Sequence, residues 1–166
     1  MINFRLISEF QPIQRRPFSV ATPAILNPVD GNPLLDGEFL GQNSAYKMDR
    51  DAAGTGTNEQ SSTPQWCVFA ERGRYETQAI QKVPMLYLGS YEAETKIMSA
   101  GTDLGADAIA TVGQPLYVGN CTIGGLVKRG LRGVNTAGIT NELSIGFVTR
   151  LPADNGGWLR FIWNLC

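Results

Sequence analysis

The fold is decided by the stretch from Gly113 to Trp163. It contains Gly113-Gln-Pro-Leu-Tyr-Val-Gly119, Gly124-Gly-Leu-Val-Lys-Arg-Gly130, Leu143-Ser-Ile-Gly-Phe-Val-Thr-Arg-Leu-Pro152 and Trp158-Leu-Arg-Phe-Ile-Trp163. Each piece is a short run of β-branched, aromatic or aliphatic residues bounded by Gly, Pro, Asn or Asp. That pattern is typical of strands joined by turns. The stretch therefore predicts an all-β fold.

The last of these pieces alternates strictly. Because successive side chains of a strand point to opposite faces, Leu159, Phe161 and Trp163 share one face. A strand so rich in large apolar groups would promote aggregation if it formed an open edge. We therefore expect this strand to be buried inside a closed barrel or a sandwich.

An earlier segment echoes the start of the stretch. Gly37-Glu-Phe-Leu40 and Gly113-Gln-Pro-Leu116 share the form Gly, polar, any residue, Leu. Each is followed by an Asn and then by a basic strand. The echo predicts two hairpins of similar build in a barrel of repeated β-units, although coincidence explains so few letters equally well.

Composition narrows the class of protein. A chain of 166 residues suits one domain with length to spare for an appendage. Charged residues make up 17% of the chain, against a typical value of about 25%, which suggests that much of the surface meets other protein. The net charge of −1 does not favour nucleic acid or an anionic membrane. No apolar run is long enough for a membrane span, and the N-terminus does not read as a secretion signal.

Histidine is absent, and cysteine is sparse. The lack of histidine removes the usual general base and the commonest transition-metal ligand. Cys67, Cys121 and Cys166 cannot all pair, and their wide spacing matches no zinc site, so we expect reduced thiols and production in the cytosol. Cys67 and Cys121 are expected in or near the barrel core as small apolar groups.

The first 30 residues differ from the rest. Prolines 12, 17, 23 and 28 recur every five or six residues, which argues against a long helix or a central strand. We therefore expect an extended N-terminal arm over residues 1–30 and a β-barrel domain over residues 31–166. The arm should be mobile in the free protein, because a single chain has little means of burying its apolar groups, and ordered against a partner. The residues predicted to bind that partner are Phe4, Leu6, Ile7, Phe10, Ile13, Arg15, Arg16 and Phe18.

Between the two parts, the polar residues 51–64 predict a surface loop. Residues 85–98 predict a long extended run bent at Gly89, and Thr102–Val112 is the one candidate for a short helix. Trp66, Tyr87 and Trp158 are spare aromatics that predict self-association.

Candidate sites for chemistry are few. Asp36, Asp49 and Asp51 could hold a divalent metal, but they lack the pattern of a calcium loop, and a solvated hairpin end is favoured. Glu92 and Glu94 share one strand face and could form an acid–base pair, but a polar outer face is favoured. We therefore assign no catalytic, cofactor-binding or metal-binding residue, and we expect no enzyme.

Four motifs together resemble the head-decoration, or capsid cement, proteins of tailed bacteriophages. They are Gly37-Glu-Phe-Leu40 with its following Lys-containing strand, Leu88-Gly-Ser-Tyr-Glu-Ala-Glu-Thr95, Val112-Gly-Gln-Pro-Leu-Tyr-Val118 and Ile145-Gly-Phe-Val-Thr-Arg150. The resemblance implies a small β-barrel or β-tulip domain with an extended N-terminal arm. It also implies a homotrimer that binds the major capsid protein on the outer surface of the virion and has no catalytic activity. The loop at 51–64 and the long arm depart from the smallest members of that family.

Two other classes of protein fit the same pattern. A tail-tube, baseplate or head–tail joining protein would also be all-β, arm-bearing and poor in charge. The least favoured alternative is a carbohydrate-binding module or a small β-barrel enzyme.

Overall fold

The computed structural model shows an all-β chain, with no helix in the part that it describes. That part comprises residues 3–11, 14–19, 34–42, 48–49, 66–68, 82–98, 109–133, 144–154 and 157–165. Its strands are β1 (Phe4–Glu9), β2 (Gln14–Ser19), β3 (Phe39–Gln42), β4 (Met48–Asp49), β5 (Trp66–Val68), β6 (Lys82–Thr95), β7 (Pro115–Ile123), β8 (Leu126–Arg132), β9 (Gly146–Arg150) and β10 (Leu159–Leu165). All pairings between these strands are antiparallel.

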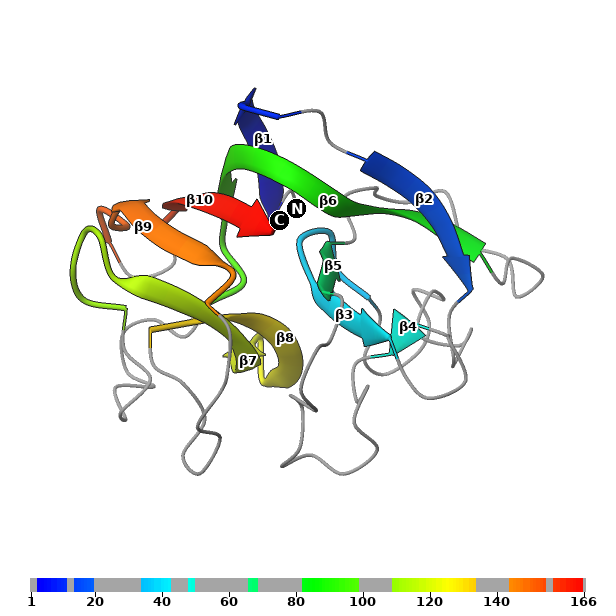
Figure 1. Ribbon diagram of the computed structural model, residues 1–166. Coiled ribbons are helices and arrows are strands. Elements are labelled where there is room, and N and C mark those ends of the chain that lie inside the picture. Colours follow the sequence, from blue (N-terminus) through cyan, green and yellow to red (C-terminus); the bar gives the residue numbers. More distant parts are fainter. Residues whose placement is uncertain are drawn as a thin grey trace.

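Five strands form a barrel-like ring (Figure 1). Neighbouring strands pair in the order β6-β10-β9-β7-β8, and the ring returns to its start where Met98, just after β6, bridges Leu131 of β8. The Leu131 amide donates to the Ile97 carbonyl at 3.0 Å. A side-chain carbon at Gly130 would lie 2.5 Å from that same carbonyl oxygen, so only glycine permits this approach. The arrangement confirms the predicted small β-barrel-like domain.

The strand β6 belongs to both halves of the sheet. Its residues before Gly89 pair with β2 and β5, whereas Tyr91–Thr95 lie between β1 and β10. Gly89 itself has a φ of 123°, which residues with a side chain rarely adopt. The bend that the sequence predicts at Gly89 therefore falls where one continuous strand passes from one set of partners to the other.

The N-terminal strands run along the whole length of β6. Residue pairs between β1, β2 and β6 extend from Thr95 at one end to Lys82 at the other. Between β1 and β2, the amides of Phe10 and Gln11 both donate to the Ser90 carbonyl, at 2.8 and 3.0 Å. The two strands thus act as one interrupted edge strand. The expected boundary between arm and barrel at residue 30 lies outside the described residues.

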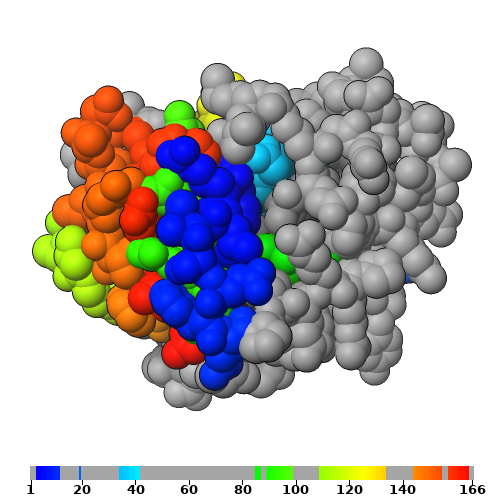
Figure 2. Space-filling view, turned by 90° about the horizontal axis from the view of Figure 1, so that it is seen from above, coloured from blue at the N-terminus to red at the C-terminus, as the bar shows by residue number. Residues whose placement is uncertain are grey.

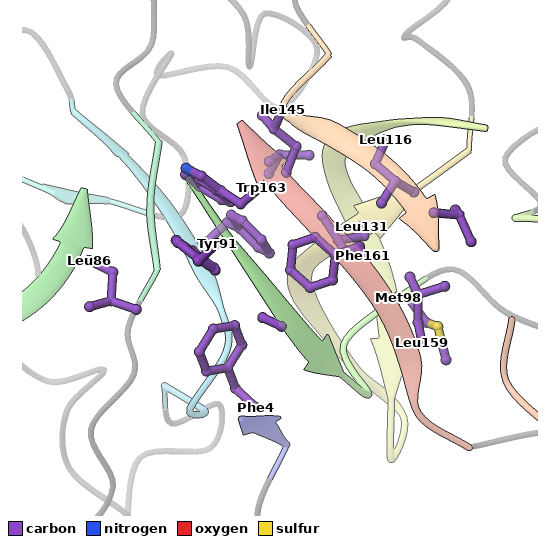
Figure 3. Packing of buried hydrophobic residues seen from close by; sticks show 14 residues of the cluster. Phe4, Leu86, Tyr91, Met98, Leu116, Leu131, Ile145, Leu159, Phe161 and Trp163 are labelled. Carbon is purple, nitrogen blue, oxygen red and sulfur yellow. The ribbon is translucent and has the colours of Figure 1, made fainter. Parts of the chain in front are cut away.

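The core centres on an aromatic stack inside the curled sheet (Figure 3). The ring of Trp163 lies 5.3 Å from that of Phe39 and 5.6 Å from that of Tyr91, with nearly parallel planes. Leu159 and Phe161 are buried beside it, so the predicted apolar face of the last strand is confirmed. Burial of each such side chain contributes about 1.5–3 kcal/mol.

Phe4 also belongs to this core. Its side chain is 7% exposed, and Leu6 packs against the same cluster. The expectation that a single chain has little means of burying the apolar groups of the arm is therefore wrong for Phe4. The physical reason is the alternation of β1, which turns Phe4 and Leu6 inward and Arg5 outward. The exposed side of β1 also carries the apolar Ile7, at a β-bulge against β6, and this hides the pattern in the sequence.

The two predicted hairpins are present. The pair β7–β8 is joined by Gly124-Gly125, whose φ values of 60° and 80° are those of a type I′ turn. The pair β3–β4 joins Gly41 to Asp49. The strand predicted within Leu143–Pro152 corresponds to β9.

Other predictions have mixed outcomes. Cys121 is a buried free thiol, as expected. The side chain of Cys67, the residue Cys166 and the loop at 51–64 lie outside what the structure describes. The candidate helix at 102–112 lies mostly outside it too, and its last residues, 109–112, are not helical. Within the described ranges, no helix is long and apolar enough to cross a membrane.

Candidate functional site

Four side chains from four strands form a row across the outer face of the sheet. Arg5 on β1, Glu94 on β6, Arg160 on β10 and Arg150 on β9 are successive cross-strand partners. The neighbours of Arg5, Glu94 and Arg160, such as Phe4, Ala93 and Phe161, are buried in the core, so the period of two turns these three residues outward. Arg150 joins them where the register between β9 and β10 shifts by one residue. Figure 2 shows the N-terminal strand crossing this face beside segments of β10 and β9. We call these four residues the arginine row.

The three guanidinium groups converge on one carboxylate. Arg5 Nε lies 2.7 Å from Glu94 Oε2, and Arg160 contacts Oε1 through Nε at 3.0 Å and Nη2 at 2.9 Å. Arg150 Nη2 also contacts Oε1. The Glu94 side chain is only 2% exposed although it lies on the outer face. The row therefore ties four strands together through a carboxylate that solvent barely reaches.

The charge state of Glu94 follows from these contacts. Burial by itself would raise the pKa of this carboxyl group, but the hydrogen bond from Arg160 and the positive charges of Arg5, Arg160 and Arg150 outweigh it, and the pKa lies below its ordinary value. Glu94 is thus ionised near neutral pH. A group that holds no proton at that pH is unsuited to act as a general acid.

Trp158 lies beside the arginine row. The guanidinium carbon of Arg5 is 4.0 Å from the centroid of the Trp158 ring, and Lys96 Nζ is 5.1 Å from it. These are cation–π distances, so the half-buried Trp158 orients both cations. Of the other predicted self-association residues, Trp66 lies on β5 and Tyr87 on β6, and their side chains lie outside the described structure.

The outer edge of β1 carries exposed apolar groups. The side chains of Ile7 and Phe10 are 41% and 57% exposed. β1 pairs only with β6, so no strand of the described ranges covers its other edge.

The remaining residues predicted to bind a partner are less fully described. Arg15, Arg16 and Phe18 lie on β2, which also pairs with β6, but their side chains are outside the description. Ile13 lies wholly outside it.

A shallow hollow opens beyond the arginine row. Its volume is about 270 Å³, and it is lined by Gly113, Pro115, Ser144, Gly146, Phe147 and Asn164. Phe147, the cross-strand partner of Pro115, is 41% exposed. The hollow therefore has a half-exposed apolar side chain in its lining.

A second carboxylate cluster lies at the corner before β3. Asp36 Oδ2 accepts hydrogen bonds from the amides of Asn3 at 2.8 Å and Phe4 at 3.2 Å. Glu38, which is fully buried, lies 3.8 Å from Lys128 Nζ. Asp36 thus holds the start of β1, which is a structural role and not the metal-binding role weighed from the sequence.

The chemistry available in the described ranges is limited. Glu92 accepts a hydrogen bond from Thr149 Oγ1 at 3.0 Å, and Glu94 is occupied by arginines. This arrangement supports the polar outer face over the acid–base pair. Within the same ranges, no three His, Cys, Asp or Glu side chains gather as metal ligands would.

Sequence reasoning missed Arg5, Arg150, Arg160 and Phe147 as site residues. The one signal was the period of two, which places Arg160 on the face opposite Leu159, Phe161 and Trp163, whereas Phe147 shares its side of the strand with Ile145 and carries no such signal. Register across four strands, which no local pattern shows, brings the three arginines together.

No protein-family model, curated protein or solved structure matches this chain.

Proposed function

We propose that this chain is a structural virion protein that binds the outer surface of a bacteriophage capsid and stabilises the shell. It acts without catalysis, as a homotrimer, and contacts the major capsid protein or a neighbouring copy through its N-terminal edge strand. The four motifs quoted from the sequence suggest this role.

The observation that carries the proposal is the outer edge of β1. An uncovered edge strand offers a row of backbone donors and acceptors to another chain, and aggregation follows unless a specific partner uses it. Here the edge also presents Ile7 and Phe10, two large apolar side chains that are 41% and 57% exposed. A partner that pairs with β1 would cover both at once.

The structure changes which part of the N-terminal segment is available. Phe4 is part of the core of this chain, so deletion of residues 1–20 should damage the barrel and not merely remove a docking element. Ile7 and Phe10 remain free to contact a partner. Substitutions at these two positions therefore separate binding from folding.

The test is decoration of expanded capsids of the encoding phage by purified protein. The double variant Ile7→Asp/Phe10→Asp should lose capsid binding in co-sedimentation while its unfolding temperature stays close to that of the wild type. Val127→Asp, which changes an exposed valine on β8, is the matched control and should bind normally. Unchanged binding by the double variant would reject the edge of β1 as the docking element.

Electron microscopy of the decorated particles tests the assembly. We expect density for three copies at three-fold positions of the shell. Rings of another symmetry at the tail or at the head–tail junction would replace this proposal with the tail-tube, baseplate or joining protein.

A further inference from the structure

The arginine row carries more positive charge than Glu94 requires. Arg160 alone makes two contacts to this carboxylate, which is enough to neutralise one buried negative charge. Arg5 and Arg150 add two further charges, and Lys96 adds a third near Trp158. The nearest carboxylate in the next row, Glu92, is held by Thr149. A purely structural ion pair leaves this excess unexplained.

The outer donors of the two flanking arginines point to solvent. Each guanidinium group has five N–H bonds, whereas Arg5 and Arg150 each contact Glu94 through a single nitrogen. Neither has another hydrogen-bond or ion-pair partner among the described residues. Their side chains are 49% and 56% exposed. Both therefore keep donors free for a second anion.

These donors are already positioned. Arg5 is stacked on Trp158 and tied to Glu94, so little side-chain entropy remains to be lost when it binds. Planar guanidinium groups match carboxylates, and the row already binds one carboxylate in this way. Phe147 is exposed on the same outer face, and arginine, tryptophan and aromatic residues dominate the energetics of protein interfaces.

We propose that the arginine row, with Trp158, is a docking site for an acidic segment of a partner protein. Arg5 and Arg150 reach the same Glu94 carboxylate from β1 and from β9, so their guanidinium groups lie close together and the segment would present a carboxylate, or two neighbouring ones, to this point of the sheet. A protein segment fits better than a nucleic acid, because the chain as a whole carries a charge of −1 and an apolar side chain flanks the row. The inference rests on the proposed function only for the identity of the partner, which would then be the capsid.

The test measures binding of a fluorescent peptide that alternates glutamate and serine, by anisotropy at low salt. The wild type should bind, and Arg150→Gln should bind about fivefold more weakly, the effect of one exposed ion pair. Arg150→Lys should fall between them, because a lysine keeps the charge but not the planar fork. Glu9→Gln, an exposed change on β1, is the control and should not weaken binding.

Several results would overturn the inference. They are the absence of peptide binding by the wild type, and binding by Arg150→Gln that equals that of the wild type. A single-stranded oligonucleotide of equal charge that binds as tightly as the peptide would assign the row to nucleic acid. Thermal unfolding of each variant should show that the fold is retained, and Arg5→Gln supplies a second test should Arg150→Gln unfold.

The two proposals fail separately. Peptide binding by a protein that decorates no capsid would leave the acidic docking site and remove the capsid role. If Arg150→Gln weakens neither capsid decoration nor peptide binding, the capsid role stands and the acidic docking site is rejected.

Discussion

Two corners of the molecule have the same backbone plan and different surroundings. Gly37 and Gly113 both have positive φ, at 90° and 84°, and each is followed by a polar residue and a strand. The amides of Glu38 and Gln114 donate to the carbonyls three residues earlier, at 3.1 and 3.3 Å. Each side chain also accepts a hydrogen bond from the backbone amide three residues earlier, Glu38 from Leu35 and Gln114 from Thr111. The echo in the sequence is therefore a real structural repeat.

The difference lies in what covers each corner. At Gly37 the N-terminal strand lies on top, and Asp36 holds its first amides. At Gly113 no atom lies within 4 Å of the place that a side-chain carbon would take, and the adjacent Val112 is exposed. The same local sequence thus forms a buried turn at Gly37 and an exposed turn at Gly113. The local residues determine the conformation of the turn, whereas distant segments determine how strongly it is stabilised.

The largest expected effect comes from giving each corner the polar residue of the other, which means Glu38→Gln at one and Gln114→Glu at the other. Glu38 lies beside Lys128, and its Oε1 accepts the amide of Arg129 at 3.3 Å. Loss of the carboxylate leaves a buried cation without this counter-charge, so Glu38→Gln should lower the free energy of unfolding by about 3–5 kcal/mol. Gln114→Glu should cost about 1–2 kcal/mol, because a carboxylate oxygen would then face the Gly133 carbonyl to which Nε2 now donates.

Urea unfolding followed by tryptophan fluorescence measures both values. Equal losses for the two variants would show that the corners do not differ in burial as described.

The next comparison substitutes the two glycines. Both carry positive φ, so alanine should cost about 1–2 kcal/mol at either position. At Gly37 the new Cβ would also lie 2.8 Å from Phe4 Cβ, whereas Gly113 has open space. Overpacking adds about 1–3 kcal/mol, so Gly37→Ala should be the more destabilising by that amount. The same urea titration gives the difference, and a larger loss at Gly113 would contradict the packing of β1 on Gly37.

A smaller effect concerns the attachment of β1. Asp36→Asn replaces an acceptor of two backbone amides by an amide group, and a hydrogen bond to a charged group contributes about 1.5–3 kcal/mol. We expect a loss near the lower end of that range, with faster hydrogen exchange at Asn3 and Phe4 and no change near Gly113. Val112→Asn, at the equivalent position of the open corner, is the control. Exchange that rises equally at both corners would contradict a local role.

The sequence predicted those features that depend on neighbouring residues. The alternation of Leu159, Phe161 and Trp163 showed which face is buried, and Gly124-Gly125 showed the hairpin turn. These follow from the period of a strand and from the freedom of glycine, which act over a few residues.

What the sequence could not show depends on contacts between distant strands. Glu38 and Lys128 look like surface charges in the sequence and are buried together. Arg5 and Arg150 are separated by most of the chain and meet only because β1, β6, β10 and β9 pair in one register. The candidate site consists of such contacts, so sequence reasoning recovered Trp158 but not the arginines beside it.

The smallest expected effect distinguishes the corners by pH. The pKa of Glu94 lies below its ordinary value of 4.5, so its ion pairs with Arg5 and the other arginines contribute fully above that pH. The contribution is lost as the pH falls through the lowered pKa, because protonation favours the state in which the carboxyl group has no arginine partner. Its size should be below about 1 kcal/mol, since Arg5 and Arg150 are half exposed.

Acid should therefore loosen β1 near Arg5 before it affects the Gly113 corner, where Gln114 does not titrate. Hydrogen exchange from pH 6 down to about pH 3 can follow both regions, after correction for the intrinsic rate of exchange. In Glu94→Gln, protection of β1 should be lower at neutral pH, and the part of its acid sensitivity that comes from Glu94 should disappear. An unchanged acid response in this variant would mean that the arginine row does not hold β1 in place.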